Sequence, residues 1–335
     1  MALKRRLGEF EIIERFFAPL ARGEGGALAL VDDAAILPPM GRGRHMVVTT
    51  DAIVAGVHFL ADDPAEVVAL KALAVNLSDL AAMGADPRAY LLVAALPKTL
   101  PTAWIGRFAR GLARGQRRFG IHLIGGDTVA TPGPLTLNIC AIGSVSRGAE
   151  LRRSAAIVGD AVYVSGTVGD AALGLRALRG ELAGLGARQR AVLVRRYREP
   201  DPRIELGRAL GRMKRTERVH AAIDVSDGLV ADVTHICEAS GVGATIEAER
   251  LPLSDAVRVA LGRDAALLKT IVSGGDDYEL AFTAPPLSAR SLARLSGRSG
   301  VPVTAIGTIV SDRRVRVLSG DGRELEIRNG GYRHF

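Results

Sequence analysis

The stretch AVNLSDLAAMGADP, residues 74–87, decides how the first half of this chain folds. Its leucines and alanines predict the second half of a helix that packs into a core and stops at Gly84. Asn76, Ser78 and Asp79 interrupt the apolar pattern. A carboxylate near the C-terminal end of a helix is disfavoured by the helix dipole, by about 0.3–1 kcal/mol when it is exposed. A cation bound by Asp79 would more than offset this penalty, whereas an Asp79 that faces solvent would have no functional meaning.

The sequence around this stretch mixes helical and strand-like segments. Apolar residues at helical spacing predict helices over 9–17, 64–83, 101–119, 170–179, 188–197, 202–213 and 228–240. Apolar and β-branched runs predict strands over 45–50, 89–96, 121–124, 135–144, 161–165, 244–247, 279–283 and 303–309. The two kinds of element do not alternate strictly enough for a doubly wound sheet. We therefore predict an α+β fold with α/β layers.

A polar segment, SVSRGAELRRSAAIVGD at residues 144–160, separates the two halves of the sequence. The chain has 335 residues, which is enough for about two domains of ordinary size. We place the domains at 1–148 and 149–335.

The composition is typical of a globular protein outside the membrane. Hydrophobic residues make up 48% of the chain, and no apolar run reaches the ~20 residues that span a bilayer. No signal-peptide core follows the first residues, so we expect a cytoplasmic location. The two cysteines, Cys140 and Cys237, lack metal-type spacing and indicate buried thiols.

The net charge of +8 raises the question of a polyanionic partner. The arginines are spread along the whole chain, and their densest stripe, within residues 107–118, has the spacing of a solvated helix face. Aromatic residues are only 4%, too few to suggest base stacking. We therefore expect no nucleic-acid partner.

Several short apolar runs are followed by aspartate. A single aspartate of this kind is usually a turn or cap residue, as Asp227 before Gly228 could be. Together they suggest a cation site, because clustered carboxylates repel one another and oxygen ligands favour Mg²⁺, Mn²⁺ or Ca²⁺. Thr49, Thr50 and Ser226 add hydroxyl oxygens. The aspartates of this group are Asp32, Asp33, Asp51, Asp127, Asp224, Asp227, Asp276 and Asp277.

Glycine-rich turns accompany these acids at residues 124–128, 165–170 and 273–277. Such turns let backbone N–H groups approach a phosphate closely. The segment YVSGTVGDAALGL, residues 163–175, could also present a helix N-terminus to an anion. A P-loop, a G-x-G-x-x-G fingerprint after a strand, H-E-x-x-H and G-x-S-x-G are all missing from the sequence. The acids and glycine turns, in the absence of these motifs, favour a reaction between two phosphorylated substrates. Divalent ions bound by the acids would screen the repulsion between the two substrates.

Motifs along nearly the whole chain resemble those of the thiamine-monophosphate kinase family. They include TTDAIVAGVHF at 49–59, KALAVNLSDLAAMGADP at 71–87, LIGGDT at 123–128, IDVSDGL at 223–229, SGGDDYEL at 273–280 and GYRHF at 331–335. The resemblance implies the fold of the aminoimidazole-ribonucleotide synthetase superfamily, in which the N-terminal mixed sheet pairs with that of a second subunit in a homodimer core. It also implies the last step of thiamine diphosphate biosynthesis, direct phosphoryl transfer from ATP to thiamine monophosphate with several Mg²⁺ ions.

The resemblance also implies roles for individual residues. Those similar to catalytic residues are Asp51, Asp79, Asp127 and Asp224. Those similar to metal ligands are Asp33, Thr49, Thr50, Asp51, Asp79, Asp127, Asp224 and Asp227. Those similar to ATP contacts are Gly126, Asp127, Arg153 and Ser226. Those similar to contacts with thiamine monophosphate are His58, Asp276 and Tyr332.

Two positions depart from the family's pattern. Members usually carry Glu where this chain has Asp276, so its carboxylate is one methylene further back and Asp277 is an alternative substrate contact. In the family, the helix before the LIGGDT motif often carries an aromatic residue near the nucleotide. In this chain, Arg110 occupies approximately that position. The adenine contact from that helix is therefore not predicted.

Other functions predict different features. An aminoimidazole-ribonucleotide synthetase would not carry the NLSDLAAMGA and GYRHF pair, and a selenophosphate synthetase often has a reactive Cys near its N-terminus, whereas the first cysteine here is Cys140. A basic nucleic-acid-binding protein would show salt-sensitive binding to DNA or RNA without phosphoryl transfer. A structural Ca²⁺ module would need a twelve-residue EF-hand loop, and the sequence has none.

Overall fold

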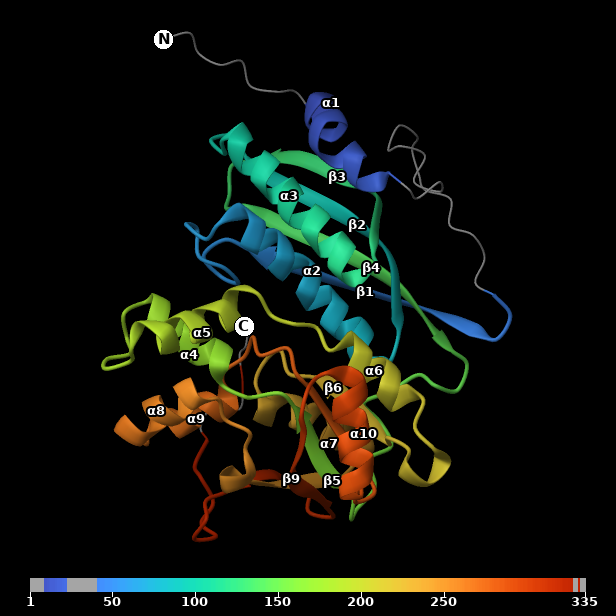
Figure 1. Cartoon of the computed structure of the whole chain (residues 1–335), viewed down its shortest axis with the longest axis vertical. Helices are drawn as coiled ribbons and strands as arrows, with labels where there is room; N and C mark the ends of the chain where they lie inside the picture. Colours follow the sequence, from blue (N-terminus) through green and yellow to red (C-terminus); the bar gives the residue numbers. More distant parts are fainter. Residues whose placement is uncertain (1–8, 23–40, 328–330, 332–335) are drawn as a thin grey trace. The chain divides into compact units, whose positions relative to one another are not determined.

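The computed structural model describes residues 9–22, 41–327 and 331 (Figure 1). The chain forms two compact units. Unit 1 comprises Met1–Leu80 and Asp86–Arg147, and unit 2 comprises Ala81–Ala85 and Gly148–Phe335. The α+β class predicted from the sequence is confirmed in each unit, since both combine a sheet with packed helices.

Unit 1 is built on a four-stranded mixed sheet of order β1-β4-β2-β3. Its strands are β1 (Arg44–Val54), β2 (Asp86–Pro97), β3 (His122–Thr131) and β4 (Thr136–Ser146). Strand β4 pairs antiparallel with β1 and with β2. Strands β2 and β3 are parallel, because helix α3 (Thr102–Phe119) carries the chain back between them. The chain before the sheet is helical over α1 (Glu9–Ile12), η1 (Ile13–Phe17) and η2 (Ala18–Ala21).

Helix α2 (Ala65–Ala82) and helix α3 lie side by side against one face of this sheet (Figure 1). They approach closely where Gly111 faces α2, because a Cβ there would lie 2.5 Å from the Glu66 carbonyl oxygen. The opposite face of the sheet leaves Met46, Val48, Val93 and Val129 exposed by 51%, 56%, 39% and 44%. We call these four residues the open face of unit 1.

Unit 2 contains a six-stranded sheet of order β10-β7-β9-β5-β8-β6, antiparallel except for the β10–β7 pair. Its strands are β5 (Ala161–Ser165), β6 (Ala221–Asp224), β7 (Gly243–Glu247), β8 (Leu280–Ala284), β9 (Val303–Val310) and β10 (Val315–Leu318). Its helices are α4 (Asp170–Leu178), α5 (Ala187–Arg198), α6 (Ile204–Gly211), α7 (Leu229–Ser240), α8 (Asp255–Arg263), α9 (Leu267–Ser273) and α10 (Ala289–Ser299), with 3-10 turns η4 (Arg215–Glu217) and η5 (Ala248–Arg250).

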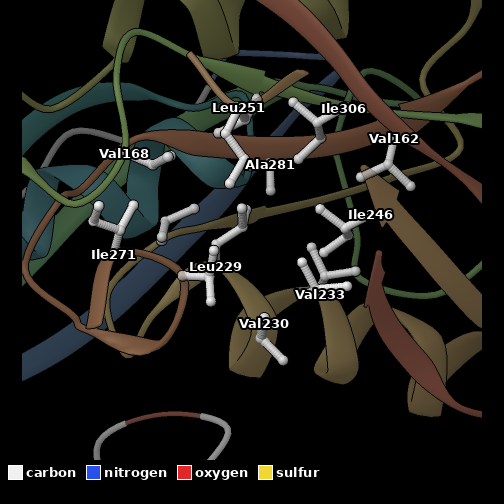
Figure 2. Close-up of a cluster of buried hydrophobic side chains, with 14 of the residues drawn as sticks. Val162, Val168, Leu229, Val230, Val233, Ile246, Leu251, Ile271, Ala281 and Ile306 are labelled. Atoms are coloured by element: carbon white, nitrogen blue, oxygen red, sulfur yellow. The ribbon is translucent and has the colours of Figure 1, made fainter. Parts of the chain in front are cut away.

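The core of unit 2 forms between the sheet and its helices (Figure 2). Val162, Ile246, Ala281 and Ile306 come from the strands, and Val233 represents the apolar side of α7. All five are fully buried. This packing fixes the strand ends from which the loops of the candidate site emerge.

The helices and strands predicted from the sequence are present, but several strands run further than predicted, two of them by at least four residues at one end. Strand β1 continues past Thr50 to Val54, and β3 continues past Ile124 to Thr131. The interpretation that Asp51 and Asp127 follow the ends of strands was therefore wrong. Both lie inside edge strands, where an exposed side chain is tolerated because one edge of the strand faces solvent.

Five helices and strands of unit 2 were not predicted: β6, β10, α8, α9 and α10. Helices α8 and α10 have N-cap signals, since the hydroxyls of Ser254 and Ser288 accept hydrogen bonds from the N–H groups of Val257 and Ser291. None of the helices in the described part of the chain combines the length and the apolar character that a membrane span requires. The cytoplasmic location stays a prediction.

Candidate functional site

In unit 1, the last turns of α2 are tied to β1 by side chains from the opening motif. The Thr49 hydroxyl donates to Asp79 Oδ2 at 2.5 Å. Asn76 is buried; its Oδ1 accepts the Asp51 N–H at 2.9 Å, and its Nδ2 donates to the Ala72 carbonyl at 3.1 Å. Two of the polar residues that interrupt the helix, Asn76 and Asp79, therefore bind the neighbouring strand. They bring Thr49, Asp51 and Asp79 together.

This group has the chemistry of a magnesium site. Two carboxylates and a hydroxyl supply only oxygen donors, which Mg²⁺ prefers. Asp79 is half-buried and Asp51 is exposed, so one carboxylate is held by the fold while the other faces solvent. The residues present fit a hard divalent cation.

Asp127 occupies a different position in the same unit. The register pairs Asp51 with Ile139, Ile139 with Leu92, and Leu92 with Gly126. Asp127 belongs to the next row of the sheet and therefore to the opposite face. Strands β1 and β3 are the two edges of the sheet, separated by three spacings of ~4.8 Å, or about 14 Å. The structure does not bring Asp127 to Asp79 within unit 1.

Gly126 is required by the sheet itself. Its φ is +151°, and a Cβ there would collide with the Leu92 carbonyl oxygen. The glycine before Asp127 thus allows β3 to pair with β2, whatever else its N–H contacts.

Two other predicted residues lie near the end of β1. Thr50 is exposed, and its hydroxyl donates to Asn138 Oδ1 at 3.2 Å and to the Ile139 carbonyl at 3.1 Å. His58 Nδ1 accepts the Val54 N–H at 3.0 Å. A neutral His58 ring therefore carries its proton on Nε2, which makes Nε2 a hydrogen-bond donor.

In unit 2, carboxylates gather where β6 leads into α7. Asp224 ends β6 and is buried, and Asp227 is half-buried in the following loop. Asp232 Oδ2 accepts the N–H groups of Asp227 and Gly228, both at 3.1 Å. Burial, followed by the nearby charges of Asp224 and Asp227, raises the pKa of Asp232 well above its ordinary value. Donor atoms of Asp227, Asp232 and His235 lie within 4.8 Å of one another. Their mutual repulsion and oxygen-rich donor set fit a cation.

The loop at 225–228 is bound to the loop at 273–278. The N–H of Asp276 donates to the Ser226 carbonyl and that of Tyr278 to the Val225 carbonyl, both at 2.8 Å. A Cβ on Gly228 would lie 2.6 Å from the Ser273 carbonyl oxygen. The absence of a side chain at Gly228 therefore allows the two loops to pack backbone against backbone. Ser226 and Asp276, predicted to contact different substrates, are therefore neighbours.

The turn before α4, which the sequence suggested could present a helix N-terminus to an anion, presents it to a carboxyl group of the chain itself. The Asp277 carboxylate occupies that position: it accepts the N–H of Gly169 at 2.5 Å and that of Ala171 at 3.0 Å. Burial raises the pKa of Asp277 to about 7, despite the opposing effect of these N–H groups and of Arg196. Because Asp277 is buried and caps the helix, it does not replace Asp276 as a substrate contact.

The remaining predicted residues are more loosely placed. Arg153 is exposed in the loop before β5, and its carbonyl accepts the Ser240 hydroxyl at 3.3 Å. Arg110 lies on the exposed side of α3 and pairs with Glu66 at 3.2 Å. Asp33 and Tyr332 lie outside the described residues.

Sequence reasoning missed the residues that hold the site in place. Asn76 could have been found, since it precedes Asp79 by one helical turn in the opening motif. Asp232 lies four residues after Gly228 and resembles an ordinary helix residue. The arginines that bind Glu279 have no signal, because their pairing joins segments about 80 residues apart.

Comparisons with known proteins identify relatives of both halves of the chain. The models for AIR synthase related protein, N-terminal domain and C-terminal domain, match residues 31–145 and 158–319. The chain is 42% identical to the thiamine-monophosphate kinase of Caulobacter vibrioides over 331 residues, covering 97% of this chain and 90% of the relative.

Solved structures give the same result. The crystal structure of thiamine-monophosphate kinase from Stenotrophomonas maltophilia is 42% identical and superposes with a TM-score of 0.82, covering 95% of this chain and 98% of that one. A structure described as AaThiL complexed with AMPPCP and TMP is 29% identical, with a TM-score of 0.75 and complete coverage of both chains.

Proposed function

Since the chain belongs to the AIR synthase related proteins and, among them, to the thiamine-monophosphate kinases, we propose that it transfers the γ-phosphoryl group of ATP directly to the phosphate of thiamine monophosphate, with several magnesium ions. The chain is an ATP-dependent thiamine-phosphate kinase. Three parts of this statement are proposals: the direct in-line transfer, the magnesium ions, and the place of the reaction as the last step of thiamine diphosphate biosynthesis.

The observation that carries the proposal is the Thr49–Asp79 hydrogen bond beside the Asn76–Asp51 bond. These two bonds place the oxygens of Thr49 and Asp51 near the Asp79 carboxylate. The negative charge of Asp79 is unfavourable near the C-terminal end of its helix. We assign metal binding in unit 1 to Thr49, Asp51 and Asp79, with Asp33 as a further ligand. Thr50 follows Thr49 in the strand, so its hydroxyl lies on the opposite face of the sheet and we assign it to a second ion. Asp127 lies on the other face of the sheet, so we assign it to a separate ion.

Unit 2 supplies the second set of proposed ligands. Asp224 and Asp227 would hold magnesium beside Asp232, which burial and hydrogen bonds fix in place. Bound magnesium would screen the charge between the phosphates of the two substrates and keep the attacking and leaving oxygens in line.

The chain's other residues orient the substrates. We assign ATP contacts to Gly126, Asp127, Arg153 and Ser226, where a guanidinium suits phosphate oxygens. His58 would donate its Nε2 proton to thiamine monophosphate, and Asp276 and Tyr332 would contact the same molecule. No strong general base is needed, because the second pKa of a phosphate ester is about 6 and the acceptor is largely a dianion at pH 7.

We also propose that the active form is a homodimer. The open face of unit 1 places four apolar side chains on one side of a sheet whose other side is covered by helices. Burying such a face against a second copy would remove apolar area from water, at ~25 cal/mol per Å².

The proposal is tested by incubating the purified protein with Mg²⁺, thiamine monophosphate and ATP labelled in the γ-phosphate. Label in thiamine diphosphate is the expected result, and its loss with EDTA and return with Mg²⁺ would establish the metal requirement. A chiral γ-phosphorothioate should be transferred with inversion, because one direct step inverts phosphorus. Retention of configuration at phosphorus, or a labelled protein formed from ATP alone, would contradict direct transfer. Inosine triphosphate serves as the comparison phosphoryl donor.

A further inference from the structure

Glu279, at the entry to β8, is a fully buried carboxylate held by two arginines. Arg203 donates from Nε to Oε2 at 2.6 Å and from Nη2 to Oε1 at 2.5 Å. Arg196 donates from Nη2 to Oε1 at 2.7 Å, and the Ser165 hydroxyl donates to Oε2 at 2.6 Å. We call Glu279, Arg196 and Arg203 the Glu279 cluster. The two-point contact of Arg203 fixes both direction and distance.

Stability alone is a weak reason for such a cluster. Taking charges out of water opposes their attraction, and buried ion pairs can often be replaced by apolar residues without loss. Burial by itself would lower the pKa of Arg203, but the Glu279 and Asp201 carboxylates raise it above its ordinary value. The guanidinium therefore stays charged and keeps its geometry.

The loop next to Glu279 has an unfavourable backbone. Within the described residues, the non-glycine residues with positive φ are Ala155, Asp276 and Tyr278. Asp276 has a φ of +73° and Tyr278 a φ of +50°. Such conformations persist only where the surrounding structure holds them, and they concentrate at functional sites.

Contacts on both sides hold this loop. Arg196 Nη2 binds Glu279 and also donates to the Asp277 carbonyl at 3.1 Å. The Asp277 carboxylate is anchored at the N-terminus of α4. Tyr278 OH donates to Asp276 Oδ1 at 3.3 Å. The segment from Asp276 to Glu279 is thus fixed at successive residues while the Asp276 side chain stays half-buried.

We propose that the Glu279 cluster is a positioning device that keeps Asp276 and Tyr278 in their left-handed backbone conformation and thereby aims the Asp276 carboxylate at the acceptor substrate. The inference rests on the proposed function for its substrate. Arg203 and Glu279 act through Asp276 and do not touch the reacting atoms. A misplacement of ~1 Å in a contact of this kind can lower the rate by about 10²-fold.

The first test compares Arg203→Lys and Glu279→Gln with the wild type. Lysine keeps the charge but loses the guanidinium fork, and glutamine keeps the shape but loses the charge. We expect KM for thiamine monophosphate to rise at least about tenfold in both variants, with KM for ATP within about twofold. The matched control is Arg258→Lys, a substitution of an exposed arginine on α8 that should change neither constant. Unchanged KM for thiamine monophosphate in a folded Arg203→Lys protein would overturn the inference.

A double mutant separates positioning from general damage. If Arg203 acts through Asp276, adding Arg203→Lys to Asp276→Ala should change KM for thiamine monophosphate by less than about twofold. Multiplied effects of the two substitutions would show that Arg203 acts elsewhere, and would overturn the inference. If Arg203→Lys does not fold, the same cycle is made with Glu279→Gln.

Hydrogen exchange provides a readout that needs no substrate. The N–H groups of Asp276 and Tyr278 are hydrogen-bonded in the native loop, so Arg203→Lys should speed their exchange at least about tenfold while β5 stays protected. Equal exchange in wild type and variant would overturn the inference even if activity falls. A wild type that makes no thiamine diphosphate, together with faster loop exchange in the variant, would overturn the proposed function and leave the loop-holding role of the cluster standing.

Discussion

At the scale of single residues, the proposed site pairs the candidate ligands with residues that hold them in place. Asp79 accepts from Thr49, and Asp51 is held through its backbone by Asn76. The polar residues of the opening motif are therefore not interchangeable. Asp79 carries the charge, whereas Asn76 fixes the strand beside it.

We expect Asp79→Asn to lower kcat by at least about 10²-fold with little change in the melting temperature, because even partners behind the metal ligands contribute 10–100-fold. Steady-state kinetics and a thermal melt measure the two quantities. Asp255→Asn, at an exposed helix residue, is the control. A variant with near-normal turnover would contradict the metal role of Asp79.

We expect Asn76→Ala to destabilise the fold by about 1–3 kcal/mol, because the Asp51 N–H loses its acceptor in a partly buried position. The Mg²⁺ concentration for half-maximal activity should rise about tenfold, as for other residues that support a metal ligand. Denaturant unfolding and a Mg²⁺ titration test this. An unchanged Mg²⁺ requirement would show that Asp51 is positioned without Asn76.

At the scale of elements, strand pairing and helix caps decide which glycines and acids are structural. Gly126 allows β3 to approach β2, and Asp277 caps α4. Both belong to motifs that the sequence analysis interpreted as phosphate-binding. In each case the first requirement on the residue is structural.

We expect Gly126→Ala to destabilise unit 1 by at least about 2 kcal/mol, since it combines a strained φ with overpacking against the Leu92 carbonyl. Gly125→Ala is the matched control, because its nearest neighbour is the flexible end of Leu91 at 3.1 Å. Equal unfolding free energies for the two variants would contradict this reading of the strand pair.

A pH dependence follows from the cap of α4. Burial raises the pKa of Asp277 from 3.8 to about 7, so the native state holds a proton that the unfolded state releases. This contribution to stability is complete below about pH 4 and is lost as the pH rises to about 7. Asp277→Asn, which keeps an acceptor oxygen, should flatten the unfolding free energy over this window. An unchanged pH profile would show that Asp277 is ionised throughout.

The sequence predicted the long elements better than their ends. The helix over 64–83 was confirmed because its apolar pattern and its stop at Gly84 are local signals. The extent of β1 was not predicted, because Asp51 lies on an edge strand whose exposure depends on the sheet order. The roles of Asp277 and Glu279 depend on partners far along the chain, which no local pattern specifies.

At the scale of the whole molecule, each unit has its own sheet, and the open face of unit 1 leaves four apolar side chains exposed. Val48→Asp should convert the proposed homodimer to a monomer, because a charge would have to be buried without a partner. Sedimentation velocity measures this, with Val192→Asp on α5 as the control at a similarly exposed valine. A wild type that sediments as a monomer would contradict the dimer.

Helix α2 gives its last residues, Ala81 and Ala82, to unit 2. There a Cβ on Gly207 would collide with the Ala81 carbonyl, and Leu151 donates its N–H to the Met83 carbonyl at 3.2 Å. A fragment beginning at residue 148 would therefore lack a piece of its own interior. Protein engineers who wish to express that half separately would have to graft the 81–85 peptide back, or supply it in trans.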